Sequence, residues 1–160
     1  MKLTIRKITE NDNATLAKMI RTVFEEHDAP KEGTVYSDPT TDNLYKLFRN
    51  NKSVLWVATI NQKAIGCCGL FPTEGLKDGC VELVKFYLAK EARGLGIGKK
   101  LLTQSITTAK ELGYKEIYLE SLPIYKTAIH LYEREKFKKI DTPLGNSGHT
   151  SCDVWMLKKL

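Results

Sequence analysis

Seven consecutive residues near the middle of the chain have the composition of an anion-binding loop. Arg93-Gly94-Leu95-Gly96-Ile97-Gly98-Lys99 follows the apolar run Val84-Lys85-Phe86-Tyr87-Leu88 and precedes a stretch with helical periodicity. Closely spaced glycines let the backbone turn tightly and approach a ligand, and the first N–H groups of the following helix have no helical acceptors. This order of strand, loop and helix predicts a site for a phosphate or pyrophosphate group.

Two common phosphate-binding loops do not fit this spacing. A P-loop has four residues between its glycines and a Ser or Thr after the lysine, whereas Gly94 and Gly98 enclose three residues and Lys99 precedes Lys100. A dinucleotide-binding loop has its last glycine three residues after the second, in the first βαβ unit of its domain. Here the glycines alternate with other residues in mid-chain, so both classes are excluded.

Two glutamates are candidates for proton transfer. Glu82 lies in the otherwise apolar run 80–88, where burial raises the pKa of a carboxyl toward a value useful to a general base. It can act directly or through a water, and a carboxylate that only orients the substrate is an equal alternative. Glu120, at the end of the run 117–121, is the second candidate. The base therefore remains open between Glu82, Glu120 and water alone.

Apolar patterns indicate the elements that must position these groups. Alternating or continuous apolar runs bounded by turn residues predict strands at 3–8, 54–60, 64–71, 80–88, 117–121, 137–140 and 152–157. Helical spacing predicts helices after the capping residues 9–12 and at 41–48, 99–112 and 127–134. Strands interleaved with helices indicate an α/β or α+β fold, in which helices cover both faces of a sheet.

Length and composition restrict the class of protein. A chain of 160 residues without a visible linker or repeat predicts one domain, residues 1–160. The net charge of +6 favours polyanionic partners, but no basic run or recognition module points to nucleic acid. No apolar run approaches the roughly 20 residues that span a bilayer, and the first residues lack a signal-peptide pattern. We therefore expect a cytoplasmic protein without a membrane partner.

The spacing of cysteines and histidines predicts no metal site. Cys67, Cys68, Cys80 and Cys152 do not have zinc-ligand spacing, and the adjacent Cys67 and Cys68 face opposite sides of a strand. We expect free thiols. His149 is expected to be a surface-loop residue, and a place in a substrate pocket is the alternative.

The glycine loop and a second motif together resemble a known enzyme family. Arg93, Gly96 and Gly98 match the pattern Arg/Gln-x-x-Gly-x-Gly/Ala, and Ala128-Ile129-His130-Leu131-Tyr132 matches an Ala-x-x-Leu-Tyr helix. With the order of strands and helices, these motifs resemble the GNAT superfamily of acyl-CoA-dependent N-acetyltransferases. The resemblance implies a mixed, mostly antiparallel sheet of about seven strands, with a bulged fourth strand that splays from the fifth and with helices on both faces.

The resemblance also implies where acetyl-CoA binds and which side chains react. The acyl-CoA inserts between the splayed strands, the Phe86 amide holds the acyl carbonyl, and the Leu88 backbone pairs with pantetheine. Tyr132 protonates the leaving thiolate, and a core aromatic is its alternative role. The implied catalytic residues are Tyr132 and Glu82, and the implied cofactor-binding residues are Phe86, Tyr87, Leu88, Arg93, Gly94, Leu95, Gly96, Ile97, Gly98 and Lys99.

Two positions depart from the family pattern. Tyr125 stands where relatives often have an asparagine that hydrogen-bonds pantetheine, and Lys136 stands where they often have glycine. If residue 136 is left-handed, a side chain there costs about 1 kcal/mol. Neither departure affects the glycine loop or Tyr132.

The implied function is direct transfer of an acetyl group from acetyl-CoA to a primary amine of a small molecule or peptide, in a ternary complex, by a monomer or homodimer. An acyl-CoA-binding sensor or partner module with little activity is the alternative. The polar segment 28–40, with Glu32 and Asp38, either covers the acceptor and attracts a cationic amine or is a solvated connection.

Overall fold

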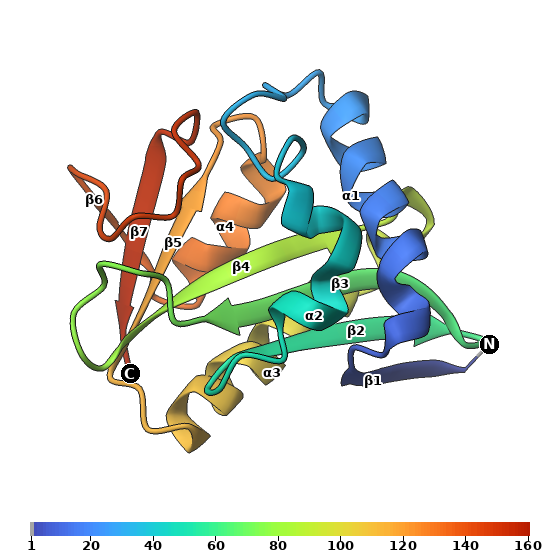
Figure 1. The fold of residues 1–160 in the computed structure, drawn as a ribbon, viewed down its shortest axis with the longest axis horizontal. Helices are drawn as coiled ribbons and strands as arrows, with labels where there is room; N and C mark the ends of the chain where they lie inside the picture. The colour runs from blue at the N-terminus through green and yellow to red at the C-terminus, as the bar shows by residue number, and fades with distance from the viewer. Residues whose placement is uncertain (1) are drawn as a thin grey trace.

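A seven-stranded sheet forms the centre of the computed structural model, which describes residues 2–160 (Figure 1). Its strands are β1 (Leu3–Lys7), β2 (Val54–Ile60), β3 (Lys63–Phe71), β4 (Cys80–Leu88), β5 (Glu116–Ser121), β6 (Lys138–Ile140) and β7 (Val154–Lys159). They lie in the order β1-β2-β3-β4-β5-β7-β6. β4 and β5 are parallel and the other neighbouring pairs are antiparallel, which confirms the predicted mixed, mostly antiparallel sheet.

Helices cover both faces of this sheet, as predicted. α1 (Asn13–Glu26) and α2 (Leu44–Leu47) lie on one face, and α3 (Ile97–Glu111) and α4 (Lys126–Arg134) lie on the other (Figure 1). Short 3-10 helices form the connections at Glu10–Asp12, Pro39–Asn43 and Lys90–Ala92. Within residues 2–160, every helix is too short or too polar to span a bilayer.

Each face of the sheet carries its own hydrophobic core. α1 presents Leu16, Ile20 and Phe24 to one core at helical spacing, and each such buried side chain contributes roughly 1.5–3 kcal/mol. The adjacent residues Cys67 and Cys68 belong to opposite cores, as their alternation along β3 predicts. The two cores hold β3 and β4 between them and fix the strand that carries Glu82.

The element boundaries differ from the sequence prediction by a few residues. α3 begins at Ile97 and β7 begins at Val154, each two residues from the predicted start. The helix predicted at 41–48 divides into the 3-10 helix Pro39–Asn43 and the four-residue α2. Lys136 has φ 69°, so the strained left-handed backbone considered for this position is present.

Candidate active site

A cavity of about 800 Å³ opens where β4 and β5 separate. The two strands pair only over residues 80–82 and 116–118 of the described chain and then diverge (Figure 1). Beyond Glu82 the edge of β4 that faces β5 has no ladder partner within residues 2–160. A backbone edge of this kind can pair with an extended ligand that carries amide groups, and the splay predicted between strands 4 and 5 is confirmed.

A bulge in β4 shapes the middle of the cavity. The register with β3 passes from Gly69↔Val84 to Cys67↔Tyr87, so two residues of β4 stand where β3 supplies only one. The extra residue, Lys85, has φ 55° and its carbonyl accepts a hydrogen bond from Cys67 Sγ at 3.0 Å. The bulge places Lys85 and the neighbouring Phe86 side by side in the cavity wall.

The glycine loop forms one end of the cavity. Gly94 and Gly96 both have φ 75°, a conformation that favours glycine. A Cβ on Gly98 would lie 3.1 Å from Leu88 Cδ1, so this glycine allows α3 to begin close against β4. Lys100 N donates to Gly96 O at 3.2 Å, so the three N–H groups of residues 97–99 precede the first helical hydrogen bond. Such N–H groups at the start of a fifteen-residue helix form an anion site.

The Arg93 side chain connects the glycine loop to β4 and α1 by hydrogen bonds. Its guanidinium donates to the Leu88 carbonyl at 3.0 and 3.3 Å and to Glu26 Oε2 at 2.8 Å. The side chain thereby ties the loop to the end of β4 and to the last turn of α1. In this arrangement Arg93 orders the loop, whose backbone N–H groups face the anion site.

Glu82 lies at the opposite end of the cavity and is only 3% exposed. Burial raises its pKa to about 7, with a further contribution from the charge of Glu120, although a hydrogen bond from Thr73 opposes the shift. That bond, from Thr73 Oγ1 to Glu82 Oε1, is 2.6 Å long. A carboxyl with this pKa can accept a proton at neutral pH, which fits the predicted general base.

Glu120 has a different environment. It accepts a hydrogen bond from the Tyr118 hydroxyl at 2.6 Å on one oxygen and from Ser147 Oγ at 2.5 Å on the other. Both oxygens are therefore engaged, whereas one oxygen of Glu82 has no side-chain donor within residues 2–160. Glu82 is the better placed of the two candidate bases.

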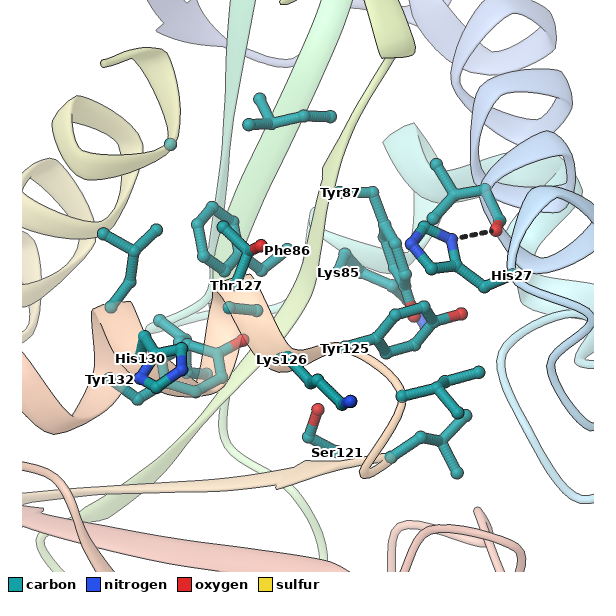
Figure 2. A pocket seen from close by; sticks show the side chains of 18 of the residues that line it. His27, Lys85, Phe86, Tyr87, Ser121, Tyr125, Lys126, Thr127, His130 and Tyr132 are labelled. Carbon is teal, nitrogen blue, oxygen red and sulfur yellow. Dashed lines mark hydrogen bonds between the residues drawn. The ribbon is translucent and has the colours of Figure 1, made fainter. Parts of the chain in front are cut away.

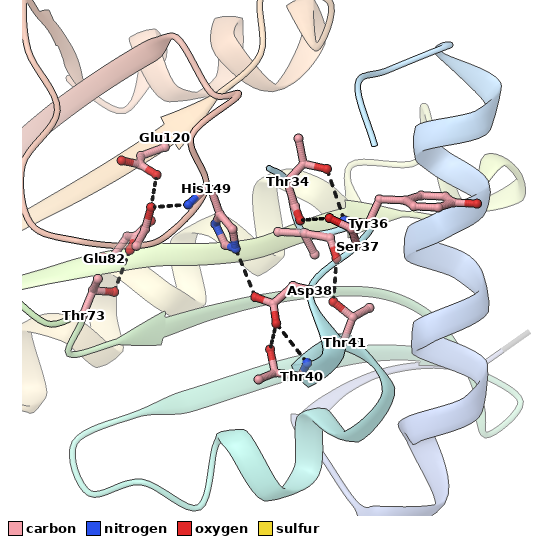
Figure 3. Close-up of polar contacts among 12 residues, drawn as sticks. Thr34, Tyr36, Ser37, Asp38, Thr40, Thr41, Thr73, Glu82, Glu120 and His149 are labelled. Carbon is pink, nitrogen blue, oxygen red and sulfur yellow. Dashed lines mark hydrogen bonds and ion pairs between the residues drawn. The ribbon is translucent and has the colours of Figure 1, made fainter. Parts of the chain in front are cut away.

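The expectation that His149 is a surface-loop residue is wrong. Its Nε2 lies 3.1 Å from Asp38 Oδ2, its side chain is 15% exposed, and it lines the cavity (Figure 3). Burial opposes ionisation of Asp38, but hydrogen bonds from Thr40 and His149 outweigh it and lower the pKa of Asp38. The contact joins two segments 111 residues apart. Thr34 and Val35 line the cavity, so the segment 28–40 forms part of the cavity wall rather than a solvated connection.

Tyr132 lies between two other aromatic rings in the cavity wall. Its ring centroid is 5.8 Å from Phe86 and 5.7 Å from Phe137, and Figure 2 shows it on the same side of the cavity as Phe86. Burial raises the pKa of Tyr132 above its ordinary value and keeps the phenol protonated. Its hydroxyl has no hydrogen-bond partner within residues 2–160 and is not sealed from the cavity.

The structure brings almost all predicted site residues into one cavity wall. Leu95 is the exception, because its side chain is 53% exposed and does not line the cavity. The predicted residues that do line it are Glu82, Phe86, Tyr87, Leu88, Arg93, Gly94, Gly96, Ile97, Gly98, Lys99 and Tyr132.

Several cavity residues were not predicted to act in the site, and Lys85 and Tyr125 are two of them. Lys85 is 6% exposed, and its charge within an apolar strand is the same signal that pointed to Glu82. Tyr125 packs edge-on against His27 with ring centroids 5.1 Å apart (Figure 2), and its enclosed hydroxyl has no hydrogen-bond partner in the described chain. The tyrosine at a position where relatives often have asparagine was the sequence feature that could have indicated a role for Tyr125.

Metal ligands do not gather in the described part of the chain. No group of three or more His, Cys, Asp or Glu side chains within residues 2–160 has a metal-binding arrangement. All four cysteines are free, and Cys152 alone among them lines the cavity.

Comparisons with known proteins agree with this geometry. The model of the acetyltransferase (GNAT) family matches residues 20–137. The uncharacterized N-acetyltransferase YjgM of Escherichia coli K12 is 36% identical to this chain over 157 residues, which cover 98% of this chain and 94% of that protein.

Solved structures show the same fold. An acetyltransferase of the GNAT family from Staphylococcus aureus aligns over 99% of both chains with a TM-score of 0.86 and 23% identity. The PaiA N-acetyltransferase from Thermoplasma acidophilum, in complex with coenzyme A, aligns over 100% of both chains with a TM-score of 0.74 and 22% identity.

Proposed function

Because the chain belongs to the acetyltransferase (GNAT) family and is therefore an acyltransferase, we propose that it moves an acetyl group from acetyl-CoA to a primary amine. The amine belongs to a small molecule or peptide, and transfer is direct, with both substrates bound together. One observation carries the proposal: a single cavity joins the anion site at the start of α3 to the Glu82 carboxyl.

The residues of the cavity fit acetyl-CoA along its length. The free N–H groups of residues 97–99 suit the pyrophosphate, and Lys99 adds a positive charge beside them. The unpaired edge of β4 near Leu88 suits the pantetheine amides. Phe86 follows the bulge at Lys85 and lines the cavity, and we assign its backbone N–H to the acyl carbonyl.

The reaction follows from three groups on this path. Glu82 accepts a proton from the acceptor ammonium, and the freed nitrogen attacks the acyl carbon. The Phe86 N–H stabilises the negative charge that develops on the carbonyl oxygen. The carbon–sulfur bond then breaks with its electron pair on sulfur, and Tyr132 donates its proton to the thiolate. As the amide forms, its nitrogen releases the remaining extra proton to solvent. Glu82 then also releases its proton to solvent and Tyr132 takes one up, so that one proton is released overall.

The state of the cavity thiol supports direct transfer over an acetyl-enzyme intermediate. Cys152 is the one cysteine in the cavity wall of the described chain. Burial, with contributions from the charges of Glu120 and Glu82, raises the pKa of Cys152 to about 12. Because the thiolate is the nucleophile, this thiol is poorly suited to attack acetyl-CoA.

The proposal is tested by incubating the purified protein with acetyl-CoA and a panel of primary amines, with detection of the acetylated amine by mass spectrometry. We expect transfer to at least one class of amine, and loss of that transfer in Tyr132→Phe. A protein that is thermally stabilised by coenzyme A but acetylates no amine, with no effect of Tyr132→Phe, would instead be an acyl-CoA-binding module.

A further inference from the structure

Lys85 is a buried lysine without a partner. Its side chain is 6% exposed, and its ammonium makes no hydrogen bond or ion pair with any residue in 2–160. Buried lysines are normally paired, because removing an ammonium from water is costly. Burial accordingly lowers the pKa of Lys85, although the charges of Asp38 and Glu82 oppose the shift. A titratable amine kept without a partner in this setting indicates a function.

The ammonium of Lys85 opens onto the cavity. In the described chain, the Tyr125 hydroxyl is the one fully enclosed polar side-chain atom that lacks a hydrogen-bond partner. The unpaired Lys85 ammonium therefore retains access to the cavity that the residue lines. Figure 2 shows Lys85 on the side of the cavity formed by Tyr87 and Tyr125, opposite Tyr132.

The carboxylates near Lys85 differ in how many hydrogen bonds they already accept from other residues. Asp38 is held by Thr40 and His149, and Glu120 is hydrogen-bonded on both oxygens. Glu82 carries a single side-chain hydrogen bond. Within residues 2–160, Glu82 and Lys85 are thus the two buried charged residues of the cavity wall, and both retain free hydrogen-bonding capacity toward the cavity.

These two groups have opposite charges and lie three positions apart on β4. Strict strand alternation would place them on opposite faces, but the bulge at Lys85 brings both to the cavity. Together they complement a molecule that carries an amine and a carboxylate close to each other. A polyamine fits poorly, because the buried Lys85 ammonium repels a second positive charge.

We propose that the acceptor is a free amino acid, whose ammonium is bound by Glu82 and whose carboxylate is bound by Lys85. This inference rests on the proposed function, since it names the substrate class of the same site. The Glu82 contact holds the nitrogen that reacts with the acyl group, whereas the Lys85 contact is remote from the bond change. Lys85 therefore determines which amine is acetylated.

The acceptor test compares amino acids with neutral analogues. The twenty standard L-amino acids are each assayed with acetyl-CoA, and every amino acid that is acetylated is compared with its amide and its decarboxylated amine. A charge-assisted hydrogen bond to a buried group makes the ratio of kcat/KM values, acid over amide, on the order of tenfold or more. We expect this ratio to fall to about one in Lys85→Met and to recover in part in Lys85→Arg.

Control variants separate recognition from other effects. Lys139→Met removes an exposed lysine on β6, and we expect it to retain the wild-type ratio. If Lys85 only tunes Glu82 or supports the bulge, Lys85→Met lowers kcat/KM for acid and amide alike, and the inference is overturned. Equal use of acids and amides by the wild type overturns it as well. Circular dichroism verifies that each variant is folded.

A binding measurement keeps the inference testable if no amine is acetylated. In that event the proposed function fails, and thermal unfolding is followed with coenzyme A and each amino acid. Stabilisation of the wild type by an amino acid but not by its amide, lost in Lys85→Met, supports the zwitterion site alone. The absence of any amino-acid-dependent stabilisation contradicts it.

Discussion

Replacing Glu82 by glutamine separates the proposed base from the other carboxylates of the cavity. Glu82→Gln keeps the size and the acceptor oxygen for Thr73 but cannot take a proton from the substrate. A positioned general base contributes roughly 10²–10⁴-fold, so we expect kcat/KM to fall on the order of 100-fold or more. In the wild type, kcat/KM should rise with pH and level off above a pKa of about 7, because the base must be ionised.

Glu82→Gln, which lowers activity, should raise the stability of the folded protein at pH values above about 7. The pKa of Glu82 is about 7 in the folded protein, against a reference value of 4.5, so the folded state binds this proton more tightly than the unfolded state. The stabilisation from protonation is present below pH 4.5 and is lost as pH rises through 7. The free energy of unfolding falls by about 3 kcal/mol over this pH range. Glu82→Gln does not lose this stability, because glutamine does not ionise.

Thermal unfolding at pH 5 and pH 8 measures this difference. We expect Tm of Glu82→Gln to exceed that of the wild type at pH 8 by roughly 6–12 °C, with little difference at pH 5. The matched control is Glu120→Gln, in which the inflection of kcat/KM persists and moves to slightly lower pH, because the charge of Glu120 raises the pKa of Glu82. The reasoning is refuted if kcat/KM of Glu82→Gln keeps the inflection near pH 7. It is also refuted if the Tm difference between Glu82→Gln and the wild type is the same at pH 5 and pH 8.

Three further substitutions test other parts of the structure. Tyr132→Phe should lower kcat on the order of 100-fold with little change in KM for acetyl-CoA, measured by steady-state kinetics; an equal loss in KM would indicate a packing role. Gly96→Ala strains a residue at φ 75° at the anion site, so calorimetric titration should show coenzyme A binding weakened by about fivefold; unchanged affinity contradicts that site. Lys136→Gly relieves the left-handed backbone at φ 69° and should raise Tm by roughly 2–4 °C, whereas a lower Tm would show that the lysine side chain contributes more than the strain costs.

Local periodicity was sufficient to predict most of the fold. β2 and β3 carry continuous apolar character because both faces of the sheet are covered, and the opposite orientations of Cys67 and Cys68 followed from alternation alone. The start of α3 was placed two residues late because Gly98 has low helix propensity. Its close packing against Leu88 accounts for a helical glycine at this position.

The parts of the site that depend on nonlocal contacts were not predictable in this way. The splay of β4 from β5 came only from the family resemblance, since no residue pattern specifies where two strands separate. The bulge at Lys85 inverts the face of one residue, which a period of two cannot anticipate. The contact between Asp38 and His149 joins residues 111 positions apart, and neither segment carries a local signal for the other.

Direct transfer between two substrates bound in one cavity is tested most directly by two-substrate initial-rate kinetics, combined with the mass of the protein after incubation with acetyl-CoA alone. We predict intersecting double-reciprocal lines, consumption of acetyl-CoA only when an acceptor amine is present, and no acetylated protein. Parallel lines with an acetyl group on Cys152, or consumption of acetyl-CoA that is independent of any amine, would contradict it.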